Sequence, residues 1–499
     1  MTLHIPPGLL SVQVGRFLFT TKNLFVMKII QSFWSAGKDV YADGFGWKHP
    51  ELHFMSWALS CLSLREHYDD VTLYTDSAGY DVLINKLRLP YTRVEVCFDN
   101  LKCLPRYWGY TKILAYARQS EPFVYIDSDI YLPRPLPKRL ERAALVAQNR
   151  EYGTAYYKSM TNDVLSRPGL RIPPELYDGV AAESVASYNM GLFGGRDTAF
   201  IRRFCDTVFR FMDDNDLHNP LGKNSTANCN LVMEQIFFAV MADNEHRKVE
   251  GIVPRTMRDN GYTREEFCNL SRYEKSRYFH LLGGHKRNAS VCAMLPKTLL
   301  RLYPEYYRRV TELFPWRNTA VCAEAGSFIP VPPAPSGVSE YDAFLSRVAG
   351  EYRALPLRDV WDEELLSAQS LTFLARTMRE RQAAVLQRRK HLHVTALPAL
   401  GGDKEAALIQ RLGGRPGSVA ADVAVFPQVG GNGLREVLLG DMACNIISLL
   451  DRPLTLRELT ANVLPCFGKG LGLTMRQKRE CVMREAARLV FEGLLTVAG

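Results

Sequence analysis

The sequence predicts an α/β protein: a mostly parallel sheet with crossover helices, then a helical segment and a small α+β domain. Three observations support this fold class. Strand and helix patterns alternate, a Pro-rich stretch at residues 330–337 is typical of a stiff linker, and beyond it a long helical pattern leads into a Gly-rich hairpin pattern. Strands are expected at residues 27–34, 71–77, 94–98 and 123–132, and helices at residues 51–66 and 107–117.

Two acids lie within the last of these strand patterns. Asp127 and Asp129 are separated by one residue, so along a strand both side chains point the same way. A carboxylate pair at the carboxyl end of a strand can hold a divalent cation where open α/β sheets bind ligands. The alternative is a polar strand end that faces water. The same spacing at Asp214 and Asp216 lies in a polar stretch and is interpreted as a solvated helix end or loop.

A second motif begins at His280, again after aromatic β-forming residues. His280 offers an imidazole to a metal. Gly283 and Gly284 let backbone N–H groups approach phosphate oxygens, and Lys286 brings a positive charge for a diphosphate. The alternative is a glycine turn at the surface, with His280 merely packed and Lys286 solvated.

On these two motifs the chain resembles the metal-dependent glycosyltransferases of the GT-A fold, particularly glycosyltransferase family 8. The stretch from Asp127 to Asp129 matches their DXD motif, and His280, Gly283 and Lys286 match their late His-X-X-Gly-X-X-Lys element. Family members often follow this lysine with Pro-Trp, which is absent here, so the donor and the family assignment stay open. The resemblance runs from about residue 27 to about residue 316.

The resemblance implies a Rossmann-like nucleotide-sugar-binding domain whose cofactors are Mn²⁺ or Mg²⁺ and a nucleotide-diphosphate-sugar, with a UDP-sugar the first expectation. It implies that Asp129 and His280 ligate the ion, that Asp127 ligates it or holds the donor ribose, and that Lys286 grips the diphosphate. It also implies that Ser32 and Phe33 lie against the nucleotide base.

Two further residues, Asp76 and Lys112, can be interpreted either as binding the nucleotide-sugar donor or as having a purely structural role. Asp76, at the end of a strand pattern, can accept hydrogen bonds from a base or ribose, or it can cap the helix that follows. Lys112, on the helix before the acidic motif, can point its ammonium group at the donor phosphates or sugar, or it can face solvent.

Three residues are expected near the transferred sugar. Asn189 resembles the asparagine of an Asn-X-Gly stretch that lines the donor-sugar pocket, and its amide can donate to and accept from hydroxyls. The alternative for Asn189 is a turn residue in the left-handed conformation. Glu234 and Gln235 stand where relatives usually carry Asp-Gln. The Glu234 carboxylate can take the acceptor's proton or bond the sugar.

A phosphatase of the haloacid dehalogenase type is a competing interpretation, since its nucleophile motif also begins with Asp-X-Asp after an apolar strand. Ile130 and Tyr131 follow the motif here, where such enzymes want Thr or Val, and several strands precede it. Both features argue against a phosphatase.

Composition limits the remaining choices. The chain has 499 residues, 47% of them hydrophobic, which is enough for two or three domains with substantial cores. A net charge of +9 is modest for this length and decides little. The 11 cysteines are scattered without a Cys-X-X-Cys pair, which favours free thiols in a reducing compartment. No stretch approaches the roughly 20 apolar residues of a membrane span. A cytoplasmic protein is therefore expected.

Residues 341–393 carry a helical pattern with a basic face. A basic face is most often solvated and less often meets an acidic partner. Its members are Arg376, Arg379, Arg381, Arg388, Arg389 and Lys390.

Two strand patterns at residues 421–426 and 434–439 flank a Gly-rich turn, and helices are expected at residues 441–450, from Thr455, and at residues 477–492. Thr455 and Glu458 have capping-box spacing. This order resembles PqqD-like winged-helix domains, which bind leader peptides of ribosomally made natural products as an added strand. The alternative is a DNA-binding or scaffolding winged helix, but a single arginine on the candidate recognition helix disfavours nucleic acid.

The sequence thus predicts five segments: an N-terminal extension (1–26), a GT-A domain (27–317), a Pro-rich linker (318–340), a basic helical segment (341–410) and a winged-helix peptide-recognition domain (411–499). The function expected is metal-dependent transfer of a sugar from a nucleotide-diphosphate-sugar to an acceptor, such as a precursor peptide recruited by the last domain. The alternative is a non-catalytic peptide-binding or regulatory protein whose glycosyltransferase-like domain is degenerate. The stereochemistry of transfer is left open.

Overall fold

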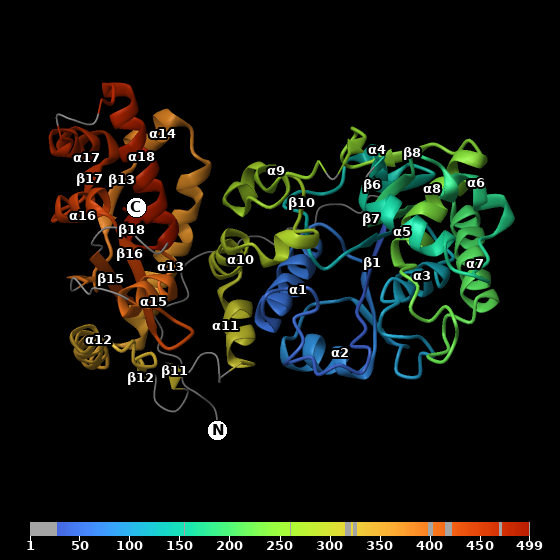
Figure 1. The fold of residues 1–499 in the computed structure, drawn as a ribbon, viewed down its shortest axis with the longest axis horizontal. Helices are drawn as coiled ribbons and strands as arrows, with labels where there is room; N and C mark the ends of the chain where they lie inside the picture. The colour runs from blue at the N-terminus through green and yellow to red at the C-terminus, as the bar shows by residue number, and fades with distance from the viewer. Residues whose placement is uncertain are drawn as a thin grey trace.

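The computed structural model of the chain describes residues 27–153, 155–259, 261–314, 321–322, 327–397, 403–414, 422–468 and 472–498. Figure 1 shows two parts side by side, one ending with α11 (Pro304–Glu312) and the other beginning near α12 (Ser339–Tyr352). The expected extension at residues 1–26 lies outside the described residues. Within the described ranges, every helix is too short or too polar to traverse a bilayer.

A mixed eight-stranded sheet forms the centre of the first part. The strand order is β3 (Arg93–Val96), β2 (Val71–Thr75), β1 (Lys28–Ser32), β4 (Phe123–Ile126), β7 (Ala186–Gly195), β6 (Leu145–Tyr152) and β8 (Val249–Gly251), with β9 (Met257–Arg258) also paired to β6. The first four strands are parallel, as predicted. β7 runs antiparallel to both β4 and β6, which the sequence patterns did not indicate.

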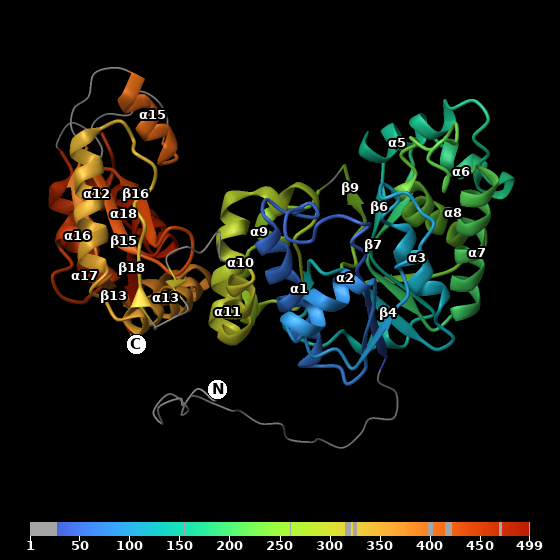
Figure 2. The ribbon, with the colours of Figure 1, turned by 90° about the horizontal axis from the view of Figure 1, so that it is seen from below.

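Helices cover both faces of this sheet, as Figure 2 shows. One face carries α1 (Pro50–Arg65), α10 (Ala289–Leu302) and α11, and the other carries α3 (Tyr110–Ala117), α7 (Thr198–Asp214) and α8 (Phe237–Asn244). Successive side chains of a strand point to opposite faces of the sheet. Leu73 therefore packs in the core on the side of α1, and Tyr74 packs in the core on the side of α3. The helix expected at residues 51–66 is confirmed as α1. The helix expected at 107–117 begins at Tyr110 instead, because a turn held by Asn230 precedes it.

The remaining elements of the first part are short. They are α2 (Ser77–Tyr80), η1 (Asp81–Lys86), β5 (Ile130–Tyr131), α4 (Lys138–Glu141), α5 (Ala155–Leu165), η2 (Pro174–Leu176), α6 (Tyr177–Ala181), η3 (Val232–Ile236), α9 (Arg264–Phe267), η4 (Leu270–Lys275), β10 (Phe279–His280) and η5 (Gly283–Arg287).

The second part contains two three-stranded antiparallel sheets with strand orders β17–β13–β18 and β14–β15–β16. Its elements, with a short pair before α12, are β11 (Val321–Cys322), β12 (Ser327–Phe328), α13 (Leu357–Ser370), η6 (Leu371–Ala375), α14 (Met378–Ala383), β13 (Val385–Arg388), β14 (His393–Ala396), α15 (Asp403–Arg411), β15 (Asp422–Pro427), β16 (Leu434–Leu439), α16 (Asp441–Ser448), β17 (Leu454–Thr455), α17 (Leu456–Val463), η7 (Leu464–Cys466), α18 (Met475–Glu492) and β18 (Leu495–Val497).

The hairpin and the three helices expected near the C-terminus are present as β15, β16, α16, α17 and α18. Thr455 and Glu458 form the expected capping box at the start of α17. The winged-helix assignment itself stays a prediction. The ten cysteines whose side chains the structure describes are free, in keeping with their scattered spacing.

The expectation of a continuous helical pattern up to residue 393 is wrong at its end, where β13 and β14 form instead. The basic face also loses one member. Arg389 is 1% exposed, donates to Oε1 of Glu364 at 2.9 Å and stacks 4.5 Å from the ring centre of Phe426. The buried carboxylate of Glu363 and the partly buried one of Glu364 attract this guanidinium inward, and the helical periodicity could not reveal these partners.

The two parts pack against each other through α10 and α13. Ala368 and Leu371 of the second part belong to the same apolar cluster as Leu295 and Leu299 of α10. Lys297 of α10 donates to the backbone oxygen of Phe491 at 2.5 Å. The first part therefore completes one of its cores with residues that follow the linker.

Candidate functional site

The acidic motif is a turn rather than a strand. β4 ends at Ile126, and the N–H of Ile130 donates to the backbone oxygen of Asp127 at 3.1 Å. The N–H of Asp127 donates to the oxygen of Gly191 on β7 at 2.7 Å. The expectation that alternation along a strand places the two carboxylates together is therefore wrong, because a turn follows β4. The turn brings both acids to one side, and Asp129 is 4% exposed, which excludes a water-facing strand end.

A short strand pair brings the second motif to the first. β5, directly after the acidic turn, pairs antiparallel with β10, and Ile130 lies opposite His280. The N–H of Leu281 donates to the backbone oxygen of Asp129 at 3.0 Å. His280 Nε2 consequently lies 3.5 Å from Oδ1 of Asp129.

Three side chains form a group that can bind a metal. Ligand atoms of Asp127, Asp129 and His280 all lie within 4.8 Å of one another. Two carboxylates and an imidazole suit Mn²⁺ or Mg²⁺, with the imidazole favouring the softer Mn²⁺. The donor set present in this chain thus fits the cation that the sequence implied.

Charges around Asp129 keep its carboxylate ionised. Lys286 Nζ lies 2.6 Å from Oδ2 of Asp129. Burial by itself raises the pKa of Asp129, but the charge of Lys286 opposes burial, and this pKa is held well below its usual range. Lys286 belongs to the short helix η5, which begins at Gly283 with a positive φ of 53°. The solvated alternative for Lys286 is therefore wrong.

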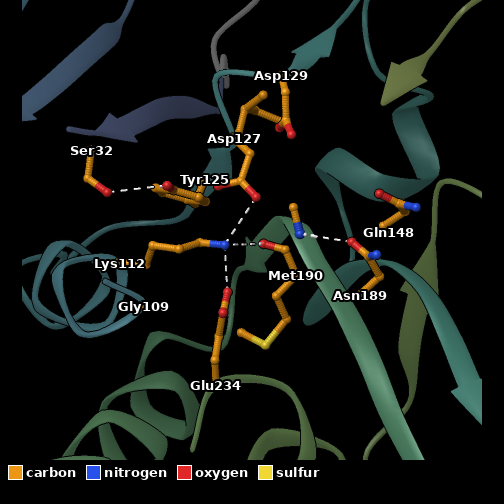
Figure 3. A network of polar contacts seen from close by, with 12 residues as sticks. Ser32, Gly109, Lys112, Tyr125, Asp127, Asp129, Gln148, Asn189, Met190 and Glu234 are labelled. Carbon is orange, nitrogen blue, oxygen red and sulfur yellow. Dashed lines mark hydrogen bonds and ion pairs between the residues drawn. The ribbon is translucent and has the colours of Figure 1, made fainter. Parts of the chain in front are cut away.

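Lys112 lies at the centre of a second polar network (Figure 3). Its Nζ is 2.6 Å from Oε1 of Glu234, 3.2 Å from Oδ2 of Asp127 and 3.3 Å from the backbone oxygen of Met190. Burial acts to lower the pKa of Lys112, but Asp127 and Glu234 raise it above its ordinary value. At 4% exposure, Lys112 does not face solvent, and it fixes one oxygen of Asp127.

Glu234 lies beneath Lys112 with no exposed surface. It occupies η3, a turn of π-helix, a feature frequent at functional sites. Burial raises the pKa of Glu234 to about 7, against the opposing influence of Lys112. The carboxylate therefore acts on its surroundings through Lys112 and is not presented to solvent.

Asn189 and Gln235 are both 8% exposed and belong to a polar wall between β6, β7 and η3. Asn189 lies within β7, so the turn alternative is wrong, and its Oδ1 accepts from the N–H of Gly191 at 3.1 Å. Gln235 Oε1 accepts from the hydroxyl of Tyr157 at 2.5 Å. The hydroxyl of Tyr262 donates to Asn149, which lies opposite Asn189.

The residues expected near the base are engaged by the protein. Asp76 caps α2 through Gly79 and accepts two bonds from Ser35, at 2.7 and 2.6 Å, so the capping interpretation is confirmed. Phe33 is 4% exposed and packs against other aromatic rings. Ser32 Oγ lies 3.2 Å from the hydroxyl of Tyr125. Their contact with a base stays a prediction.

The second acidic pair behaves as expected. α7 ends at Asp214, and the next residue is its C-cap. Asp214 and Asp216 are exposed, and neither belongs to the group of potential metal ligands found among the described residues.

Sequence reasoning missed three residues that surround His280. Gln148 Oε1 lies 2.5 Å from His280 Nδ1 and also accepts from the hydroxyl of Tyr278 at 2.5 Å. On the other side, a Cβ at Gly191 would lie 2.6 Å from Cε1 of His280. Gly191, the glycine of the Asn-X-Gly stretch, and Tyr278, in the aromatic run before His280, lie in stretches that the sequence singles out. Gln148 carries no such signal.

A model of a family of unknown function, DUF6734, matches residues 27–313. The chain belongs to this family. No curated protein matches it. The DUF6734 description names no activity.

Three solved structures resemble this DUF6734 chain. Mouse xyloside xylosyltransferase 1 has 11% identity and a TM-score of 0.26, with 45% of this chain and 84% of that chain covered. The bifunctional glycosyltransferase WbbM has 9% identity and a TM-score of 0.29, with 58% and 52% covered, so this chain spans about half of WbbM. The inositol-1-phosphate CTP transferase of T. maritima has 10% identity and a TM-score of 0.26, with 55% and 96% covered. Scores this low leave the activity to be argued from the site.

Proposed function

We propose that this protein is a metal-dependent glycosyltransferase that moves a sugar from a nucleotide-diphosphate-sugar, with UDP as the first nucleotide to test, to an acceptor hydroxyl. The observation that carries the proposal is the convergence of Asp127, Asp129 and His280, with Lys286 in contact with Asp129. Neither acid is adjacent to His280 in sequence, so a specific pairing of β5 with β10 builds the group.

Departure of a nucleotide diphosphate leaves negative charge on phosphate oxygens. A divalent cation bound by the three ligands supplies electrostatic stabilisation of that charge. Lys286 adds a second positive charge beside the same carboxylate, and the Gly283–Gly284 backbone admits a phosphate closely. Apart from the adjacent residues, no heavy atom in the described part of the chain lies within 4 Å of a Cβ added at either glycine, so the space beside them is open.

On the sugar side, Asn189 and Gln235 offer amide groups to hydroxyls. Glu234 holds Lys112, and Lys112 in turn orients Asp127. In this proposal Glu234 positions other groups, since a carboxylate without exposed surface does not reach an acceptor.

Hydrolysis of a panel of nucleotide-sugars with Mn²⁺ tests the proposal. Wild-type protein is expected to release the nucleotide diphosphate slowly, and Asp129→Ala is expected to abolish this release. Asp214→Ala is the matched control, because it removes an exposed carboxylate from the second Asp-X-Asp sequence. No nucleotide binding by the wild type would favour the non-catalytic peptide-binding alternative instead.

For the second part, we propose recruitment of a peptide acceptor to the sheet β14–β15–β16. β14 is an outer strand of that sheet, and Val394 on it is 43% exposed, a feature that suits strand addition. Deleting everything after the linker would also expose the apolar side of α10. Val394→Asp is the cleaner test: it should weaken transfer to a peptide acceptor and leave donor hydrolysis unchanged. Equal rates of peptide transfer by Val394→Asp and the wild type would exclude β14 as the strand that binds the peptide.

A further inference from the structure

The pairing of β6 with β7 is interrupted beside the candidate site. Ala147 lies opposite Phe193 and Asn149 lies opposite Asn189, so Gln148 alone faces the three residues from Met190 to Leu192. Irregularities of this kind bend a strand and redirect side chains, and they recur next to active sites.

A backbone oxygen of β7 beside the irregularity contacts the polar network. The oxygen of Met190 accepts from Lys112, and Met190 has no register partner on β6. The N–H of Asp127 donates to the oxygen of Gly191, which extends the pairing of β4 with β7 by one residue beyond Ile126 and Leu192. The pairing of β4 with β7 therefore connects the acidic turn to the sheet.

On β6 the same irregularity directs the side chain of Gln148 toward His280. Gln148 has no exposed surface, and its Oε1 lies 2.5 Å from His280 Nδ1. The hydroxyl of Tyr278 donates to the same oxygen at 2.5 Å. Figure 3 shows Gln148 beside the strand that carries Asn189, on the side of the site away from Lys112.

The other end of this amide is unsatisfied. Gln148 Nε2 is buried and has no hydrogen-bond partner among the described residues. A buried N–H without a partner is costly, and an apolar side chain of similar length would avoid that cost. The presence of a glutamine at position 148 is explained if His280 requires the side-chain oxygen as a hydrogen-bond acceptor.

The imidazole is confined from the opposite side by Gly191, where even a methyl group would lie 2.6 Å from Cε1. With Cε1 close to the backbone of Gly191 and Nδ1 bonded to Gln148, the ring is held at two of its atoms. When Nδ1–H donates to Oε1, the ring proton is on Nδ1 and the Nε2 lone pair is directed toward Asp129.

We propose that Gln148 is the positioning residue of the metal site: it holds His280 in the Nδ1–H tautomer, so that Nε2 is available to a divalent cation shared with Asp129. This inference rests on the proposed metal site. A partner on the second nitrogen of a metal-ligating histidine fixes its tautomer and ring orientation, and losing such a partner typically weakens metal binding about 10- to 100-fold.

Titration of the full-length chain with Mn²⁺ alone tests the proposal without requiring turnover. Gln148→Met removes the acceptor oxygen at similar length and should raise the Kd for Mn²⁺ about 10- to 100-fold. Gln148→Glu keeps an acceptor and should bind Mn²⁺ at least as tightly as the wild type. Tyr278→Phe is the matched control, since it removes the other bond to the same oxygen, and its Kd should stay within about threefold of wild type.

A spectroscopic measurement separates positioning from a general loss of structure. In ¹⁵N NMR spectra of histidine-labelled protein, His280 of the wild type should carry its proton on Nδ1, and Gln148→Met should shift the population toward Nε2–H. A wild-type His280 protonated on Nε2, an unchanged Kd in Gln148→Met, or a weakened Kd in Gln148→Glu would each overturn the inference. If Asp129→Ala binds Mn²⁺ as tightly as the wild type, the proposed metal site itself fails, which is a different outcome.

Discussion

Lys112 Nζ lies 2.6 Å from Oε1 of Glu234, and both side chains are buried. The same ammonium group reaches Asp127 at 3.2 Å, so one cation serves two carboxylates. The pKa of Glu234 nevertheless rises to about 7, which means that burial outweighs the attraction of Lys112. This imbalance predicts different consequences for the two partners.

Lys112→Met should be far more destabilising than Glu234→Gln. Without Lys112, two carboxylates lose their cation, and removing one partner of a buried pair costs about 3–5 kcal/mol. Glu234→Gln keeps the shape and removes a charge that burial disfavours, so its cost should stay within about 1 kcal/mol. Urea unfolding of both variants measures the difference. Equal losses would show that Lys112 is not the shared cation.

The pH dependence of stability should report Glu234. Its pKa is about 7 in the folded protein against 4.5 ordinarily, so the folded state binds more protons between these values. Stability from this group is fully present below pH 4.5 and is lost as the pH rises toward 7. Relative to Glu234→Gln, which lacks the titration, the wild type should lose about 3 kcal/mol of unfolding free energy over that range. Parallel pH profiles of the two proteins would contradict this assignment.

Gly191→Ala should disturb His280 directly. The added Cβ would lie 2.6 Å from Cε1 of a ring that Gln148 holds from another side. Overpacking of this kind costs about 1–3 kcal/mol, and displacement of the ring should weaken Mn²⁺ binding by about tenfold or more. Mn²⁺ titration and urea unfolding check both effects. Gly350→Ala in α12 is the control, since its Cβ would meet open space, and it should change neither measurement adversely.

Arg389→Ala should destabilise the second part of the chain. The variant leaves Glu363 and Glu364 without the guanidinium between them, at an expected cost of about 3–5 kcal/mol. The neighbouring Arg388 is exposed, so Arg388→Ala should stay within about 0.5 kcal/mol of wild type. Chemical denaturation of the two variants compares them. A small effect of Arg389→Ala on the unfolding free energy would show that Arg389 contributes no more to stability than an exposed residue of the basic face.

The sequence by itself determined the local features. The strands before Asp76 and Asp127, the helix α1, the capping box at Thr455 and the two chemical motifs all follow from side chains close together in the chain. Periodicity, capping and turn preferences act over a few residues, so a single sequence displays them.

Only the tertiary structure decided which distant residues meet. The pairing of β5 with β10, the register shift opposite Gln148 and the burial of Arg389 against Glu364 depend on elements far apart in sequence. Each is selected because the complete set of contacts satisfies buried polar groups and fills the cores, and no local pattern encodes that sum. Gln148 is an example, since nothing in the local sequence distinguishes this glutamine, and its contact with His280 depends on the tertiary structure.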